Sequence, residues 1–165
     1  MTLAPGAQAQ GTPVEQAVKA AYLAKFPAYV SWPAGAATGS ITICVVGDGA
    51  IGGLVQRAAT GQRIEGKPLV VRRLATLDGR DACALAYLGA SRRASLPALL
   101  NAAQRTAILT VTDARIGGNR GIIHFETIGG RVRFHIDERE AARRGIAISS
   151  KLLDLAQSVT PRSAP

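Results

Sequence analysis

Aromatic side chains are scarce in this chain of 165 residues, in which phenylalanine, tryptophan and tyrosine together make up 4%. Apolar residues still reach 47%, so the hydrophobic core has to be aliphatic, built from alanine, valine, leucine and isoleucine. No apolar run approaches the roughly 20 residues that a membrane-spanning helix needs. The length is sufficient for one domain with a substantial core and short for two.

Continuous basic runs are also absent, although the formal net charge is +9, from 20 lysines and arginines against 11 acidic residues. The sequence offers no aromatic platform on which nucleic-acid bases could stack. Arginines are instead spread along the chain, among them Arg57, Arg63, Arg72, Arg73, Arg92, Arg93, Arg143 and Arg144. We therefore expect no nucleic-acid partner and interpret the charge as a solvated surface, which would favour an acidic partner or anionic headgroups.

Cysteine is limited to Cys44 and Cys83, and without a C-x-x-C motif the sequence argues against redox catalysis. Near the N-terminus, Ala7-Gln8-Ala9 has the small-x-small form of a signal-peptidase site, but the charged and apolar regions of a signal peptide are missing. Two interpretations stay open for residues 1–12, a signal-peptide remnant and a disordered tail. We expect a single domain over residues 13–159 and a disordered tail over residues 160–165.

The first predicted helix begins after Thr12, which can cap it, with Pro13 in its first turn and Glu15 completing a capping box. Pro27 should kink or break this helix, and Trp32-Pro33 should end it. Two apolar stripes run along it, one over Val14, Val18, Ala21 and Tyr22 and the other over Leu23, Phe26 and Val30. Two stripes predict burial on two sides, against the sheet and against another surface. The predicted dimer or partner helix uses Tyr22, Phe26, Tyr29 and Trp32.

Strands and helices alternate through the middle of the chain. Apolar runs predict strands over residues 41–46, 67–74, 82–88 and 107–112. Helices are predicted over residues 50–59 and from a cap at Ser91 to Ala103. This alternation indicates an α/β fold, a flavodoxin- or Rossmann-like three-layer sandwich with a mainly parallel sheet and right-handed crossovers.

The pattern changes in the C-terminal part. Strands over residues 121–128 and 131–136 flank Gly129-Gly130, a two-residue signal for an antiparallel β-hairpin. Asp137 with Glu140 begins a short helix that Gly145 stops. A last helix, capped by Ser149 or Ser150, is expected from Lys151 to about Ser158.

Both cysteines fall on predicted strands, the first and the third. In a flavodoxin-like strand order of 2-1-3-4 these strands are neighbours, which brings Cys44 and Cys83 within plausible bridging distance. A bridge closing a loop of about 40 residues would stabilise the fold by roughly 4 kcal/mol on the chain-entropy model. The alternative is a pair of buried, reduced thiols.

A glycine motif, Gly47-Asp48-Gly49-Ala50-Ile51-Gly52, follows the first strand and opens a helix. It matches the dinucleotide fingerprint, which would hold a pyrophosphate at the helix N-terminus. The acidic residue expected after the second strand is replaced by Arg72 and Arg73, which would suit the 2′-phosphate of NADP. A helix before the first strand, the charge of Asp48 and the short remaining chain argue against an NADP-binding enzyme, and we expect no cofactor.

The hairpin turn fixes the strand register, in which Ile128 pairs with Arg131 and His124 with His135. Because side chains alternate along a strand, one face carries Ile123, Phe125, Thr127, Val132, Phe134 and Ile136 and should meet the core. The opposite face gathers His124, Glu126, Arg131, Arg133 and His135. Three interpretations stay open for it: a solvated face with a Glu126–Arg133 pair, a patch that recognises an anionic ligand or partner, and a two-histidine metal site. The last lacks further ligands, so we expect no metal. No serine or cysteine nucleophile is coupled to the histidines, so we expect no catalytic residues.

The ordered motifs along residues 14–158 resemble the YfiR family of small periplasmic proteins. Each motif is modest alone, but their order and spacing together are specific. They are Val18-Lys19-Ala20-Ala21-Tyr22-Leu23, Lys25-Phe26, Trp32-Pro33, Ile43-Cys44-Val45-Val46-Gly47-Asp48, Gly61-Gln62-Arg63, Lys67-Pro68, Cys83 with Leu85, Gly121-Ile122-Ile123-His124-Phe125, Arg131-Val132-Arg133-Phe134 and Ile148-Ser149-Ser150-Lys151-Leu152-Leu153.

The resemblance implies a non-enzymatic periplasmic repressor that binds an inner-membrane diguanylate cyclase, lowers cyclic-di-GMP and limits biofilm formation. It also implies a homodimer and an outer-membrane lipoprotein that sequesters the repressor. Cys44 and Cys83 match one bridged pair of the family, whereas a second bridge seen in some relatives has no cysteines here. Pro27 and Gly49 depart from the family pattern. The alternative function is a sensor domain for a small anion or nucleotide.

Overall fold

The computed structural model describes residues 11–36, 39–47, 49–89 and 94–163. The predictions made for Asp48, for Ser91 as a helix cap and for residues 1–10 and 164–165 lie outside these residues. The helices are α1 (Pro13–Lys25), the 3₁₀ helix η1 (Phe26–Tyr29), α2 (Ile51–Ala59), α3 (Leu96–Ala103), α4 (Glu138–Arg143) and α5 (Ser150–Leu155). The strands are β1 (Val30–Ser31), β2 (Ile41–Val46), β3 (Arg63–Ile64), β4 (Lys67–Leu74), β5 (Leu85–Leu88), β6 (Leu109–Asp113), β7 (Ile123–Ile128), β8 (Arg131–Asp137), β9 (Ala147–Ile148) and β10 (Ser158–Thr160).

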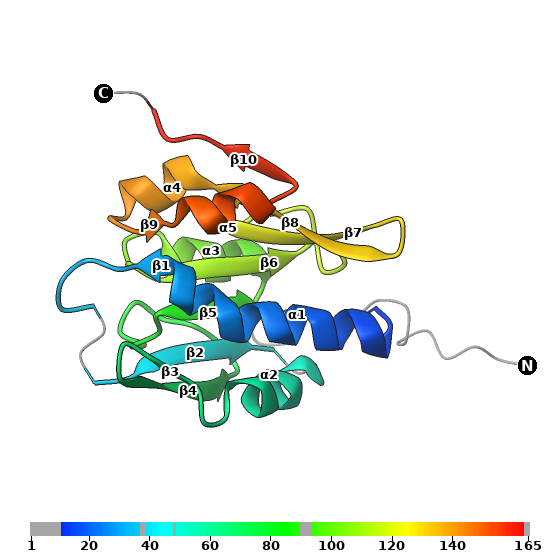
Figure 1. The fold of residues 1–165 in the computed structure, drawn as a ribbon, viewed down its shortest axis with the longest axis horizontal. Coiled ribbons are helices and arrows are strands. Elements are labelled where there is room, and N and C mark those ends of the chain that lie inside the picture. Colours follow the sequence, from blue (N-terminus) through cyan, green and yellow to red (C-terminus); the bar gives the residue numbers. More distant parts are fainter. Residues whose placement is uncertain (1–10, 37–38, 48, 90–93, 164–165) are drawn as a thin grey trace, which may run out of the picture.

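The main sheet confirms the predicted α/β class and the 2-1-3-4 order of the parallel strands. Its eight strands follow the order β10-β8-β7-β6-β5-β2-β4-β3. Strands β4, β2, β5, β6 and β7 run parallel, and β8 pairs antiparallel with β7. A short antiparallel pair, β1 with β9, lies outside the main sheet. Figure 1 shows α1 and α2 on the near side of the sheet. Helix α3 packs against the other face, so the molecule has three layers.

Each face of the sheet has its own apolar cluster. The larger cluster joins α1 and α2 to sheet residues such as Ile43, Val45 and Phe125. The smaller one joins α3 to Cys44, Val46 and neighbouring residues on the other face. Alternate residues of β2 therefore point into different clusters, as the continuous apolar run predicts for a central parallel strand. Among the described residues, no helix is long and apolar enough to cross a membrane.

The first helix follows its sequence signals with one exception. Thr12 caps it by accepting a hydrogen bond from the Glu15 amide, and Pro27 ends the α-helix by diverting the chain into η1. Glu15 does not complete a capping box, which corrects the prediction. Its carboxylate instead accepts two hydrogen bonds from Arg115, because the fold brings a guanidinium to the helix N-terminus.

The C-terminal hairpin has the predicted register from Ile128–Arg131 to Ile123–Ile136. Asp137 caps α4 through the Glu140 amide, and Gly145, with a positive φ of 75°, follows the end of that helix. The last helix is shorter than predicted: it ends at Leu155, and Ser158 begins β10, which pairs parallel with β8. A three-residue edge strand has no sequence periodicity of its own, so only its pairing with β8 defines it.

Two boundaries around the third parallel strand differ from the predictions. Strand β5 begins at Leu85 rather than residue 82, and α3 begins at Leu96, where the Ser95 side chain is the cap. Cys83 therefore precedes β5. Its sulfur is nevertheless bonded to that of Cys44 on β2, with the two Cα atoms 5.8 Å apart. The disulfide joins β2 to the segment entering β5.

Removing this disulfide should destabilise the fold. It spans 39 positions of sequence, so Cys44→Ala with Cys83→Ala should lower the free energy of unfolding by about 4 kcal/mol through the gain in unfolded-chain entropy. Denaturant titration of the oxidised chain and the double variant measures the difference. A reductant should lower the stability of the wild-type chain and leave the variant unchanged, whereas equal stabilities of all samples would contradict the structural role.

Candidate functional site

The polar face of the β7–β8 hairpin brings together His124, Glu126 and His135, as the predicted register requires. The two imidazole rings lie with their centroids 6.5 Å apart. Burial varies along this face: His124 is buried, whereas Arg131 and Arg133 are exposed. The predicted patch therefore divides into an inner part, which is held by hydrogen bonds, and an outer basic part.

His124 is a buried structural residue. Its side chain is 3% exposed, and Nδ1 lies 2.7 Å from the Thr112 hydroxyl, which also accepts a hydrogen bond from the Gly121 amide. Burial lowers the pKa of His124, and the positive charge of Arg120 and the neighbouring His135 add to this effect. The imidazole is consequently neutral in the folded protein at neutral pH.

Glu126 and His135 form the centre of the patch. Oε2 of Glu126 lies 2.6 Å from Nε2 of His135, and Nδ1 of His135 lies 2.6 Å from the Ser158 hydroxyl on β10. The hydrogen bond to His135 is the main reason that the pKa of Glu126 is lowered. The carboxylate thus pairs diagonally with His135 rather than directly across the strands with Arg133, which corrects the predicted pair. Within the described part of the chain, no cluster of three or more potential metal ligands occurs.

The outer part of the patch lies beside the hairpin turn. Arg131 and Arg133 are both exposed on β8, and Ile128, directly opposite Arg131, is 42% exposed. Two guanidinium groups next to an exposed isoleucine form a surface that suits an acidic partner with an apolar contact residue.

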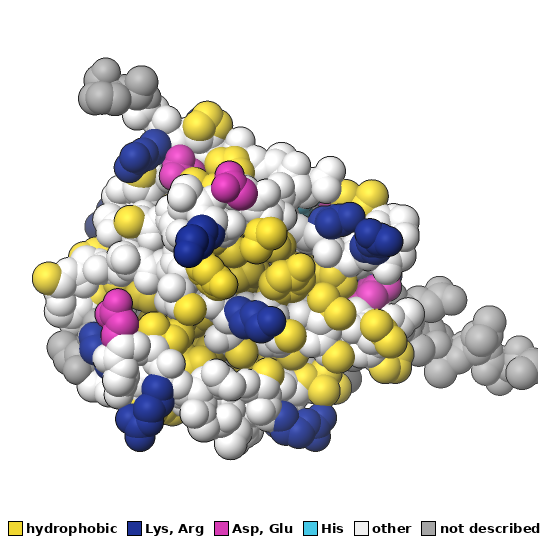
Figure 2. Space-filling model, viewed as in Figure 1, with side chains coloured by type: hydrophobic (Ala, Val, Ile, Leu, Met, Phe, Trp, Pro, Cys, Tyr) yellow, Lys and Arg dark blue, Asp and Glu magenta, His cyan; other side chains and the backbone are white. Residues whose placement is uncertain are grey.

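The predicted partner helix is exposed on only one of its two stripes. Val14 and Val18 are 73% and 37% exposed, whereas Phe26 is fully buried. Phe26 packs against Phe125 and Phe134 in the core, so it cannot contact a partner as predicted. Tyr22 stacks on Phe26 and stays half-buried at the surface. Figure 2 shows hydrophobic side chains gathered on this face, over α1 and between α1 and α5.

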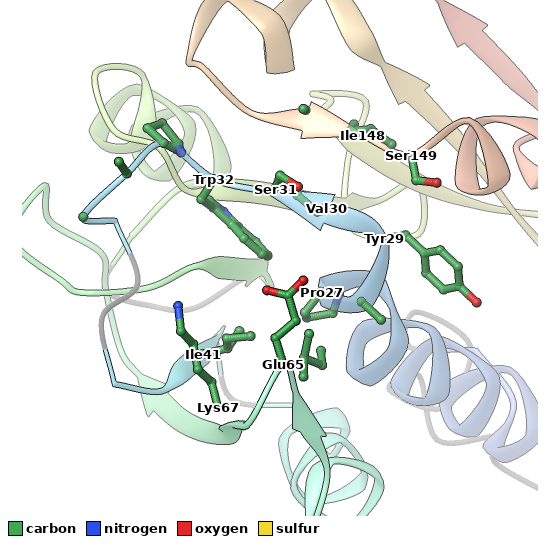
Figure 3. A pocket seen from close by; sticks show the side chains of 16 residues that line it. Pro27, Tyr29, Val30, Ser31, Trp32, Ile41, Glu65, Lys67, Ile148 and Ser149 are labelled. Carbon is green, nitrogen blue, oxygen red and sulfur yellow. The ribbon is translucent and has the colours of Figure 1, made fainter.

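Tyr29 and Trp32 lie further along the same segment, at a surface hollow of about 460 Å³. Trp32 is fixed there by a hydrogen bond from Nε1 to the Ala84 carbonyl oxygen. In Figure 3 the Glu65 carboxylate reaches into the hollow from the β3–β4 turn, with Lys67 beside it. The hollow opens at the amino ends of β2 and β4, away from the hairpin patch.

A buried ion pair, which sequence reasoning missed, anchors α1 to the sheet. Lys19 is 0% exposed and its ammonium lies 2.6 Å from Oδ2 of Asp113 at the end of β6. The Tyr87 hydroxyl donates to the same oxygen, and burial together with the Asp113 charge raises the pKa of Tyr87 well above its usual value. The spacing of Glu15, Lys19 and Leu23 could have revealed the pair, since it places two charges on the buried face of the helix.

The glycine motif has a packing role in the described residues. A Cβ atom at Gly52 would lie 2.7 Å from Nε of Arg73, and one at Gly53 would lie 2.9 Å from another nitrogen of that side chain. The glycines thus let the Arg73 side chain lie against α2.

Comparison with known protein families gives a match over most of the chain. Residues 16–157 match the family DUF4154, which is described as YfiR/HmsC-like. No curated protein matches the chain. The family match confirms the resemblance noted from the sequence motifs.

Removing the Lys19 ammonium should destabilise the fold strongly. Lys19→Met would leave the buried Asp113 carboxylate without its counter-charge and should cost about 3–5 kcal/mol in the free energy of unfolding. Lys25→Met, at an exposed position of the same helix, is the matched control and should cost about 0.5 kcal/mol or less. Similar losses for both variants, measured by denaturant titration, would show that the buried pair has no special weight.

Stability should also depend on the protonation of His124. The folded-state pKa of His124 is lowered below 6.5, so the unfolded chain binds the proton more readily than the folded protein. The stability that neutral His124 contributes is therefore fully present above about pH 6.5 and is lost as the pH falls toward the folded-state pKa. His124→Gln should flatten this slope. Nitrogen-detected NMR titration measures the pKa directly, and a value at or above 6.5 would contradict the account.

Proposed function

Because the chain belongs to the YfiR/HmsC-like family, whose members are periplasmic regulators of cyclic-di-GMP signalling, we propose that it is a repressor of an inner-membrane diguanylate cyclase. In this proposal the protein binds the periplasmic region of the cyclase, lowers cyclic-di-GMP and limits biofilm formation. An outer-membrane lipoprotein would relieve repression by sequestering the protein. The family match is the observation that carries the proposal.

The hairpin offers the best contact surface for such a partner. Arg131 and Arg133 extend from β8 beside the exposed Ile128, and the Glu126–His135–Ser158 contacts hold the strands beneath them in place. An ordered surface loses little conformational entropy when a partner binds. The two arginines would pair with acidic side chains of the cyclase, and Ile128 would supply the apolar contact.

The exposed stripe of α1 supports the second part of the proposal, a homodimer. Val14, Val18 and the half-buried Tyr22 line one side of the helix, where water contacts apolar side chains. Burying this stripe against the same stripe of a second copy would satisfy the two-sided pattern of the helix. The hairpin patch and the helix stripe use different residues, so dimerisation and cyclase binding are compatible.

A sensor that reads a small anion with Arg133 and His135 is the second candidate. Both ring nitrogens of His135 already have partners, Glu126 and Ser158. An anion at the ring would have to replace the Glu126 carboxylate, which carries the same sign of charge. The contacts around His135 therefore favour a protein partner at the outer arginines over an anion at the imidazole.

Reversing the charge of the outer arginines should weaken cyclase binding. Arg131→Glu with Arg133→Glu should raise the Kd for the purified periplasmic region of the partner cyclase by about 30-fold or more, as expected when interface arginines are lost. Isothermal titration with the oxidised chain measures this change. Arg57→Glu with Arg80→Glu, at exposed sites away from the hairpin, gives the same change in net charge and should alter Kd only slightly.

Two outcomes would count against the proposal at different levels. Equal weakening by both double variants would show that net charge matters and the hairpin does not. No binding of the oxidised wild-type chain to the periplasmic region of the partner cyclase would refute repression of that cyclase.

A further inference from the structure

A second cavity, unrelated to the hairpin patch, opens at the carboxyl edge of the parallel strands. Its volume is about 270 Å³. It is bounded by Gly47 after β2, Gly89 after β5 and Asp113 at the end of β6. Gln16 on α1, together with Ile51 and Ile116, closes its sides. The cavity therefore lies between α1, the start of α2 and three consecutive strand ends.

This position is the topological switch point of the sheet. From β2 the chain passes through α2 to β4 on one side, whereas from β5 it passes through α3 to β6 on the other. The two helices pack in different apolar clusters, on opposite faces of the sheet. Crossovers that diverge in this way leave a crevice outside the carboxyl ends of the adjacent strands, where α/β proteins of this type bind their ligands.

The strand ends are shaped to keep the crevice open. A Cβ atom at Gly89 would lie 2.7 Å from the Val46 carbonyl oxygen, so a side chain there would force β2 and β5 apart. Gly47 has a φ of 123°, which other residues rarely adopt. Both positions therefore require glycine for backbone reasons, and neither places a side chain in the crevice.

In the part of the chain that the structure describes, the charged side chains at the cavity are already paired within the protein. Asp113 binds the Lys19 ammonium and the Tyr87 hydroxyl, and Arg115 makes two hydrogen bonds to the Glu15 carboxylate. A charged ligand would therefore lose its hydration without gaining an unpaired counter-charge. Among the described residues, the Gln16 side-chain amide has no hydrogen-bond partner, and it lies at the rim. One neutral donor and acceptor thus faces the cavity.

The size of the cavity limits what it can hold. A volume of about 270 Å³ lies just below the roughly 300–1,000 Å³ that is usual for ligand pockets, which suits a single ring compound rather than a dinucleotide. The aliphatic side chains of Ile51 and Ile116 and the ring of Tyr87 favour an apolar body.

We propose that this switch-point cavity binds a small, neutral ring compound whose amide-like group hydrogen-bonds with Gln16. The ring lies between Ile51, Ile116 and Tyr87, and the polar group lies at the rim. This site is separate from the hairpin patch and does not depend on the proposed contact with a cyclase.

Three fluorinated probes of equal size test the site and its charge preference. 4-Fluorobenzamide is neutral, 4-fluorobenzoate is its anionic counterpart and 4-fluorobenzamidine is its cationic counterpart. Fluorine NMR of the full chain should show saturable binding of the amide with a Kd of about 1 mM or below, as expected for a fragment. Both charged probes should bind at least about tenfold more weakly. Amide-proton shifts should change at Gly47, Gly89 and Ile116.

Two variants that fill the cavity and one that removes the hydrogen bond assign the binding to this cavity. Ile116→Trp and Gln16→Trp should each abolish 4-fluorobenzamide binding, and Gln16 lies at a partly exposed helical position where the fold tolerates the change. Gln16→Leu should weaken binding by about three- to tenfold through loss of the hydrogen bond. Ile128→Trp, at the exposed end of the hairpin, is the control and should leave binding unchanged.

Contrary results would overturn the proposal. No saturable binding of 4-fluorobenzamide, equal binding of the three probes, or unchanged binding by folded Ile116→Trp and Gln16→Trp variants would each do so. Shifts confined to the hollow around Trp32 would place the probe elsewhere and would also refute the site.

Discussion

The buried ion pair between Lys19 and Asp113 fixes the first helix to the sheet, and both surfaces that we propose for α1 depend on it. The pair joins positions 94 residues apart in the sequence. The second contact between these segments, from Arg115 to Glu15, lies nearer the surface. With the helix held at its inner face, the stripe containing Val14 and Val18 has to face outward. The same anchoring places Gln16 over the carboxyl ends of β2 and β5, where it forms one side of the switch-point cavity.

The disulfide is a second constraint, on the opposite face of the sheet. Cys44 and Cys83 belong to the cluster that packs under α3, whereas Lys19 and Asp113 lie on the side of α1. The two constraints act on different strands: the disulfide ties β2 to the entry of β5, and the ion pair ties α1 to the end of β6. Oxidation therefore stabilises the centre of the sheet without fixing the position of α1. Neither constraint includes a residue of the hairpin patch. The side chains of the patch are held instead by the contacts of His135 with Glu126 and Ser158.

Sequence reasoning was most successful where the signal was local. The apolar runs of β2 and β4 and the Gly129-Gly130 turn were sufficient to predict the strand positions and the full hairpin register. It failed where distant segments decide the outcome. The short strands β1, β9 and β10 form only through their pairing with residues distant in the sequence. Glu15 pairs with Arg115 instead of completing a capping box, because the fold brings Arg115 close to it. Alternation placed His124 on the correct face, but its burial depends on Thr112 and Gly121 of the neighbouring strand and loop.

The family match and these features together support the proposed repressor: the α/β body presents an outer basic patch on one hairpin and an apolar stripe on one helix. The most direct measurement is the rate of cyclic-di-GMP synthesis by the full-length cyclase in lipid nanodiscs, with the oxidised chain added in increasing amounts. The account predicts that synthesis falls in a saturable manner and that the variant Arg131→Glu with Arg133→Glu inhibits only at much higher concentration. Unchanged synthesis at saturating wild-type protein, or equal inhibition by that variant, would contradict it.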